Sequence, residues 1–233
     1  MTEKILPNQF PVYVTGSPDA PLAVIVIQEA FGVNDHIRSV ADRFADSGYF
    51  AVAPELFHRA GSPEVPYDDF PSAMKYLGGL DREGLTNDLN ATTDFLATMG
   101  YHAPNVAVVG YCMGGAVSFY AATLGTVGAA VSFYGGGVET GRFGLPSLLE
   151  LAPSLKCPWL GLYGDLDSGI PVEQVEALRR ATAPLAVTTE VVRYADAGHG
   201  FNCDARPAAF NEEASLDATR RTLEFFEAHL VAK

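Results

Sequence analysis

Apolar residues along the chain fall into two alternating patterns, short unbroken runs and longer segments with helical spacing. The short runs predict strands over residues 22–27, 49–53, 106–109, 129–133, 158–163 and 187–194, and the unbroken run 22–27 is typical of a strand buried on both faces of a sheet. A further strand is predicted at a sheet edge over 10–15. Helices are expected between these strands, over residues 36–47, 86–99, 116–124, 172–182 and 211–230.

Strands and helices alternate almost throughout the chain. This order predicts a single α/β domain over residues 1–233, with a mostly parallel sheet and helices on both faces. The stretch 55–82 departs from the pattern, since it holds three prolines and only one expected short helix over 72–77. Residues 141–156 are also expected to be irregular. A long excursion such as 55–82 commonly borders a ligand site.

The segment 106–117 carries the strongest chemical signal. Its apolar run leads into Gly110-Tyr111-Cys112-Met113-Gly114-Gly115 and then into an apolar helix. Such a strand, sharp turn and helix would place Cys112 at the apex of the turn, where the helix dipole favours a thiolate. A small buried cysteine is one alternative, and a dinucleotide-binding turn is another. The sequence disfavours the dinucleotide-binding turn, because that motif requires glycine at the position where this chain has Cys112.

Polar side chains follow four of the predicted strands. Glu29, Cys112, Asp167 and His199 each come after a different strand. Because the carboxyl ends of parallel strands meet at one sheet edge, these side chains are expected to converge. A thiol nucleophile, an imidazole base and an orienting carboxylate together suit attack on a carbonyl group. Asp165 is the alternative to Asp167 as the orienting carboxylate.

The order of nucleophile, acid and histidine and the Gly-x-Cys-x-Gly turn match the α/β-hydrolase fold. From about residue 22 to 230 the chain resembles the dienelactone hydrolases, also called carboxymethylenebutenolidases. This resemblance implies an α/β-hydrolase fold. The matching segments are Gln28-Glu29-Ala30-Phe31-Gly32, Ala53-Pro54-Glu55-Leu56-Phe57, Gly110-Tyr111-Cys112-Met113-Gly114-Gly115, Gly164-Asp165-Leu166-Asp167-Ser168-Gly169-Ile170-Pro171 and Gly198-His199-Gly200-Phe201.

The resemblance also implies a role for each matching residue. Cys112 would be the nucleophile, His199 the base and Asp167 the acid that orients it. Glu29 would pair with the resting thiol and help to convert it to a thiolate, and a proton shared between the two groups is physically reasonable. The oxyanion hole would consist of two backbone amides, those of Met113 and Ala30.

One departure from the family concerns the substrate. Family members that act on carboxylated lactones carry an arginine four residues after the histidine, where this chain has Cys203. Arg59 and Arg206 are candidates to replace it, and Tyr134 is a candidate to line the pocket. A less charged lactone or ester would fit equally well.

Composition narrows the function further. The net charge of −13 and the absence of a basic run argue against nucleic acid or an anionic membrane as a partner. The first ten residues lack a signal-peptide pattern and no apolar run approaches membrane-spanning length, so a cytoplasmic protein is expected, as a monomer or alternatively a dimer. The three cysteines and five histidines show no metal-ligand spacing, and we expect no metal and no organic cofactor.

These observations predict a hydrolase that opens a lactone or cleaves a small carboxylic ester through a thioester intermediate. A thiol-based redox or ligand sensor that uses Cys112 as a switch is the alternative from another class, and acyl transfer is a third. A base and an acid placed beside the thiol favour the enzyme, because a sensor needs only the thiol.

Overall fold

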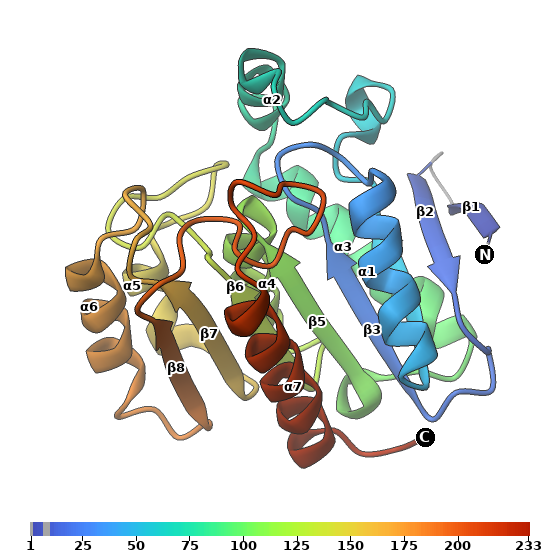
Figure 1. The fold of residues 1–233 in the computed structure, drawn as a ribbon. Coiled ribbons are helices and arrows are strands. Elements are labelled where there is room, and N and C mark those ends of the chain that lie inside the picture. Colours follow the sequence, from blue (N-terminus) through green and yellow to red (C-terminus); the bar gives the residue numbers. More distant parts are fainter. Residues whose placement is uncertain (1, 7–9) are drawn as a thin grey trace.

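An eight-stranded sheet forms the centre of the computed structural model, which describes residues 2–6 and 10–233 (Figure 1). The order across the sheet is β1-β2-β4-β3-β5-β6-β7-β8. The pairs β1/β2 and β2/β4 are antiparallel and all the other pairs are parallel. The strands are β1 (Thr2–Leu6), β2 (Phe10–Thr15), β3 (Leu22–Ile27), β4 (Tyr49–Pro54), β5 (Val106–Tyr111), β6 (Ala129–Phe133), β7 (Trp159–Gly164) and β8 (Thr189–Tyr194).

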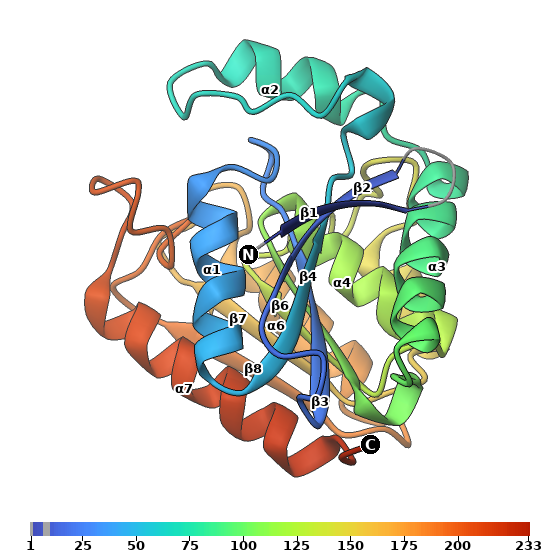
Figure 2. The same ribbon diagram turned by 90° about the vertical axis from the view of Figure 1, so that its right-hand side faces the viewer.

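Helices cover both faces of this sheet. The helices α1 (Asp35–Asp46) and α7 (Glu212–His229) lie on one face, whereas α3 (Arg82–Thr98) and α4 (Met113–Leu124) lie on the other (Figure 2). On the side of α4, α5 (Leu148–Leu151) contacts both α4 and α6 (Val172–Thr182). This topology confirms the α/β-hydrolase fold that the sequence predicted.

The central strands align their carboxyl ends. Ile27 of β3 lies opposite Gly110 of β5, and Gly110 lies opposite Ser132 of β6. Because β3, β5 and β6 consist almost entirely of apolar residues buried on both faces, a one-residue shift of register would rearrange the whole core. The loops after these strands therefore meet at one edge of the sheet.

The excursion between β4 and α3 projects beyond this edge. It contains a 3-10 turn, η2 (His58–Ala60), and the helix α2 (Phe70–Leu77), which stands above the sheet at the top of Figure 1. Helix α3 begins at Arg82, four residues before the predicted start, because the side chain of Asp81 caps it by accepting a hydrogen bond of 2.7 Å from the amide of Gly84.

Three other elements differ from the prediction. Strand β1 was not predicted. The segment 141–156, which was expected to be irregular, contains α5 and the 3-10 turn η4 (Ala152–Ser154). The helix α5 begins at a capping box in which the hydroxyl and amide of Ser147 both donate to the carboxylate of Glu150. A further 3-10 turn, η3 (Ala103–Asn105), precedes β5. Among the described residues, none of the helices is both long and apolar enough to span a lipid bilayer.

Glycine is required at the start of α4 because the loop after β3 passes directly against it. A Cβ atom at Gly114 would lie 2.5 Å from the carbonyl oxygen of Gln28 and 2.6 Å from that of Ile27. Neither carbonyl oxygen can move away without displacing β3 from the sheet. The contact of Gly114 with Gln28 therefore fixes the distance between two of the loops at the carboxyl edge.

The Gly114→Ala variant is expected to lower the free energy of unfolding by about 2 kcal/mol or more, because its methyl group overlaps two backbone oxygens. Gly78→Ala is the matched control, since a Cβ there would meet its nearest atom at 3.4 Å and the residue has an ordinary helical φ of −67°. The control should stay within about 0.5 kcal/mol of the parent protein in urea unfolding. Equal losses in both variants would contradict this account of Gly114.

Candidate active site

Cys112 occupies the sharp turn between β5 and α4. Its backbone has φ 57° and ψ −116°, a conformation that costs a residue other than glycine roughly 1–3 kcal/mol. The turn is held by its neighbours, since the amide of Cys112 donates to the carbonyl of Phe133 at 3.1 Å and the Cys112 carbonyl accepts from Gly115 at 3.0 Å. A Cβ at Gly110 would lie 1.9 Å from the Gly114 carbonyl oxygen, so only glycine fits beneath the turn. The thiol is half-buried, as the predicted apex position requires.

The loops after β7 and β8 bring His199 and Asp167 together. The Nδ1 of His199 donates to Asp167 Oδ2 at 2.6 Å, and the other oxygen of this buried carboxylate accepts from the amide of Gly169 at 2.8 Å. Asp165 lies elsewhere, with both of its oxygens bound by the guanidinium of Arg193 at 2.7 and 2.8 Å. The structure therefore places Asp167, rather than Asp165, against the imidazole.

The charge state of His199 depends on Cys112. Burial by itself lowers the pKa of His199, but the negative charge of the Cys112 thiolate and the hydrogen bond with Asp167 outweigh it and raise the pKa to about 10. The imidazole thus lies close enough to the sulfur for strong electrostatic interaction. A thiolate and an imidazolium stabilise each other in this arrangement.

Glu29 lies directly after β3 and its side chain is buried, with the residue only 1% exposed. The Tyr134 hydroxyl donates to Glu29 Oε1 at 3.3 Å, and the Tyr134 ring lies 5.0 Å from the ring of His199. Tyr134 is itself fully buried and has a positive φ of 39°. Tyr134 therefore forms an inner wall that joins Glu29 to the histidine.

The two amides expected to bind an oxyanion belong to adjoining loops. Met113 follows Cys112 as the first residue of α4, and Ala30 lies in the loop whose Gln28 carbonyl touches Gly114. In the turns and loops of the described residues, neither amide donates a hydrogen bond to another group of the protein. Both donors are thus available to a ligand.

The two candidate arginines have different surroundings. Arg59 donates to both oxygens of the buried Asp88, each at 2.8 Å, so its guanidinium is engaged away from Cys112. The guanidinium of Arg206 lies over the rings of Phe31 and Tyr67, at 5.7 and 5.6 Å from their centroids. The salt bridges within the described part of the chain do not include Arg206, so its charge is available to a substrate.

Sequence reasoning placed His36 on a helix without a chemical role, but the residue is buried at the start of α1. Its Nδ1 donates to Asp204 at 2.8 Å, and its ring lies near Glu29 and Cys203. The sequence did contain a signal for the position of His36, because side chains in the first turn of a helix point back toward the preceding loop. The first turn of α1 follows the loop that carries Glu29.

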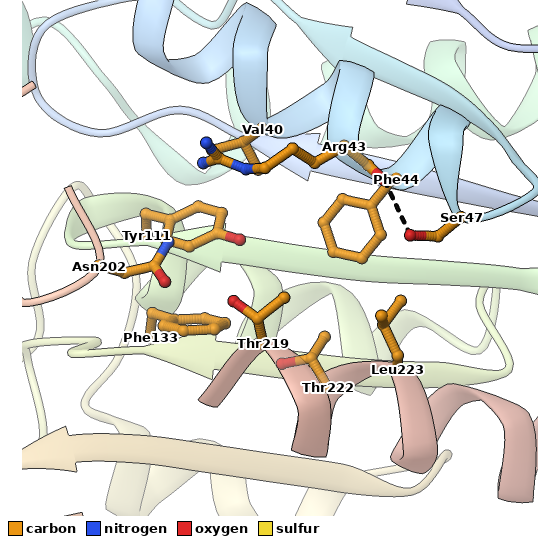
Figure 3. A pocket seen from close by; sticks show the side chains of 10 residues that line it. All are labelled: Val40, Arg43, Phe44, Ser47, Tyr111, Phe133, Asn202, Thr219, Thr222 and Leu223. Carbon is orange, nitrogen blue, oxygen red and sulfur yellow. Dashed lines mark hydrogen bonds between the residues drawn. The ribbon is translucent and has the colours of Figure 1, made fainter. Parts of the chain in front are cut away.

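Two cavities of the described residues lie apart from Cys112 and His199. A small cavity of about 40 Å³ between α1, α7 and the sheet holds at most a water molecule or two. Figure 3 shows it lined by Val40, Arg43, Phe44, Ser47, Tyr111, Phe133, Asn202, Thr219, Thr222 and Leu223. A wider groove of about 370 Å³ lies between α2 and α3 beside Arg59. Neither is lined by Cys112 or His199.

The comparisons with known proteins agree with this geometry. The chain matches the dienelactone hydrolase family over residues 10–230, nearly its whole length. This chain belongs to the dienelactone hydrolase family.

Individual dienelactone hydrolase relatives are similar over most of their length. The "Putative carboxymethylenebutenolidase" of Salmonella typhimurium is 39% identical over 210 residues, which cover 87% of this chain and 76% of the relative. The carboxymethylenebutenolidase of Pseudomonas putida is 34% identical over 218 residues, covering 91% and 89%. The crystal structure of a "Putative Dienelactone Hydrolase" from Klebsiella pneumoniae is 35% identical, with a TM-score of 0.86 and 98% of each chain covered.

The chain is therefore a dienelactone hydrolase-like hydrolase, and a small-molecule ester or lactone fits the family as its substrate. None of these three relatives is named as a thiol sensor, so that alternative gains no support from them.

Replacing Cys112 with alanine is expected to lower the pKa of His199 from about 10, by more than about one unit. The variant removes the charge that raises the pKa most and leaves the burial that lowers it. The measurement is an NMR titration of the imidazole resonances, with Cys157→Ala as the control because Cys157 is a buried thiol that contacts helix α4 instead. A pKa that is unchanged in Cys112→Ala would show that the sulfur and the ring do not interact.

Proposed function

We propose that this protein opens a lactone or cleaves a small carboxylic ester through a cysteine acyl-enzyme. The observation that carries the proposal is the Asp167–His199 hydrogen bond of 2.6 Å beside a cysteine held on a strained turn. Strain of this kind persists only where the surrounding structure enforces it, and it clusters at reactive sites. A cysteine serving only as core packing would need neither the strain nor the oriented imidazole.

The first half of the reaction forms a thioester. The Cys112 thiolate attacks the carbonyl carbon, and the amides of Met113 and Ala30 donate to the oxyanion that develops. The C–O bond to the leaving oxygen then breaks, and the imidazolium of His199 gives its proton to that oxygen. In a lactone, the released alcohol stays attached to the acyl group.

The second half regenerates the enzyme. His199 takes a proton from a water molecule as the water oxygen attacks the thioester carbon. The tetrahedral intermediate collapses by breaking its C–S bond, which yields the carboxylic acid and restores the thiolate. Asp167 holds the imidazole in one orientation and stabilises its charge during both halves.

Glu29 controls the resting state of the nucleophile in this proposal. In the resting state Glu29 pairs with the Cys112 thiol, and when a substrate enters the thiol proton passes to the imidazole of His199, which leaves the thiolate and the imidazolium that react. Support comes from the position of Glu29, which is held through Tyr134 against the ring of His199.

Arg206 is the group best placed to recognise a substrate carboxylate. Its guanidinium has no acidic partner among the described residues, and a Cβ at Gly200, next to His199, would lie 3.0 Å from one of its nitrogens. Arg59 is already bound to Asp88. The proposed substrates therefore include lactones and esters that carry a negative charge.

Cys112→Ala is expected to reduce the hydrolysis of a chromogenic short-chain ester by about 10³-fold or more, because no other group can form the thioester. Asp167→Asn should reduce kcat by about 10²-fold or more, since the amide favours the wrong imidazole tautomer. Steady-state kinetics and mass spectrometry of the acylated protein are the measurements.

The matched controls are Cys157→Ala and Asp165→Asn, which change a cysteine and an aspartate outside the proposed site. Both should keep kcat within about threefold of the parent value. Full activity in Cys112→Ala would refute the acyl-enzyme. A response of the thiol to peroxide in a protein without any esterase turnover would favour the sensor instead.

Arg206→Gln is expected to raise the KM for a carboxylated lactone by about tenfold, because it removes a charge-assisted hydrogen bond. The KM for a neutral ester should stay within about twofold. Arg59→Gln provides the comparison, since it should destabilise the fold by leaving the buried Asp88 with only His58 as a side-chain partner, rather than change the KM. A larger KM effect in Arg59→Gln than in Arg206→Gln would reverse the assignment.

A further inference from the structure

Three metal-ligand side chains meet beneath the loop that follows β3. A carboxylate oxygen of Glu29, a ring nitrogen of His36 and the sulfur of Cys203 all lie within 4.8 Å of one another, and all three residues are buried. They come from the loop after β3, the first turn of α1 and the loop after β8. Cys112 and the Asp167–His199 pair do not belong to this cluster.

Two polar atoms of the cluster have no hydrogen-bond partner among the described residues. They are Glu29 Oε2 and His36 Nε2, and their residues are only 1% and 4% exposed. An unsatisfied buried polar atom costs about 1–3 kcal/mol, and here two of the three clustered side chains each carry one. The cluster thus combines metal-ligand side chains with buried polar atoms that have no partner of their own.

The other atoms of these side chains are well supported. His36 Nδ1 donates to Asp204 Oδ1 at 2.8 Å, and Asp204 also accepts from Arg43 at 3.0 Å. Because Nδ1 is engaged by Asp204, Nε2 is the ring nitrogen left for a metal. A carboxylate on the far nitrogen is the usual support of a histidine that binds a metal.

Tyrosines hold the remaining two ligands. The Cys203 sulfur lies 3.4 Å from the Tyr67 hydroxyl, and the Tyr134 hydroxyl donates to Glu29 Oε1 at 3.3 Å. The hydroxyl of Tyr67 is fixed in turn by the side-chain amide of Asn34 at 3.1 Å. Each of the three ligands is therefore oriented by a neighbour, while Glu29 Oε2 and His36 Nε2 keep no partner among the described residues.

We propose that Glu29, His36 and Cys203 form a binding site for Zn²⁺ or a similar borderline divalent cation. One thiolate, one imidazole and one carboxylate are ligands that zinc accepts, whereas Mg²⁺ and Ca²⁺ require oxygen ligands only. Donor atoms around tetrahedral zinc lie about 3.5 Å apart, so small side-chain rotations suffice to close the cluster. A water molecule would complete the coordination.

Binding requires the loss of one proton. Cys203 is a free, buried thiol. The cation forms the S–Zn bond as the S–H bond breaks, and the proton leaves to buffer. Cys112, His199 and Asp167 are not ligands, but Glu29 belongs both to this site and to the proposed resting state of Cys112, so a bound cation takes Glu29 from that pairing.

The test uses the full chain after treatment with a chelator, titrated with Co²⁺ and Zn²⁺. We expect one equivalent of Co²⁺ to produce a near-ultraviolet band from sulfur-to-cobalt charge transfer, which Zn²⁺ then abolishes by displacement. Cys203→Ser should lose the band, whereas Cys112→Ala and Cys157→Ala should keep it. Asp204→Asn should weaken Zn²⁺ binding by about 10- to 100-fold, because it removes the support of His36.

Three outcomes would overturn the proposal: no cobalt band in the parent protein, a band that persists in Cys203→Ser, or a band that disappears in Cys112→Ala. The last would place the metal on the proposed nucleophile instead. Circular dichroism of each metal-free variant checks its folding. If Cys203→Ser fails to fold, His36→Gln replaces it, with at least about a tenfold loss of Zn²⁺ affinity expected and an unchanged affinity counting against the site.

Discussion

The contact between the loop after β3 and the start of α4 is the constraint on which the site depends. Gly114 allows the Gln28 carbonyl to approach within a distance that no side chain would permit, and Gly110 leaves room beneath the turn. These contacts enforce the unfavourable backbone of Cys112 and set the Ala30 and Met113 amides on adjoining loops. Buried strands supply the rigidity, since β3, β5 and β6 cannot shift without disrupting the core.

Glu29 stands between two groups of side chains. Through Tyr134 it is linked to His199, and one of its oxygens lies within 4.8 Å of His36 and Cys203 ligand atoms. A single buried carboxylate therefore serves both the proposed resting state of the thiol and the proposed cation site. Cys203 stands where the sequence resemblance led us to expect an arginine, so a neutral thiol lies beside Glu29 at this position. The free guanidinium of Arg206 lies nearby, over Phe31 and Tyr67.

Much of the fold was predictable because its signals are local. Unbroken apolar runs identified β3 to β8, and helical spacing identified α1, α3, α6 and α7. The errors occurred where short polar contacts decide the structure, as at Asp81, which caps α3, and at Ser147, which begins α5. Strand β1 was missed for a related reason, since its pairing with β2 determines its conformation more than its own residues do.

The sequence by itself determined the α/β-hydrolase fold and the strand ends at which Glu29, Cys112, Asp167 and His199 appear, because hydrophobic periodicity and a glycine-flanked turn are properties of neighbouring residues. Only the tertiary structure decided which carboxylate binds which basic side chain. Asp167 accepts a hydrogen bond from His199, Asp165 accepts one from Arg193, and Asp88 accepts one from Arg59. It also brought His36 beside Cys203. Such pairings join residues far apart in the chain, and their distances depend on the packing of several elements at once, which no local pattern encodes.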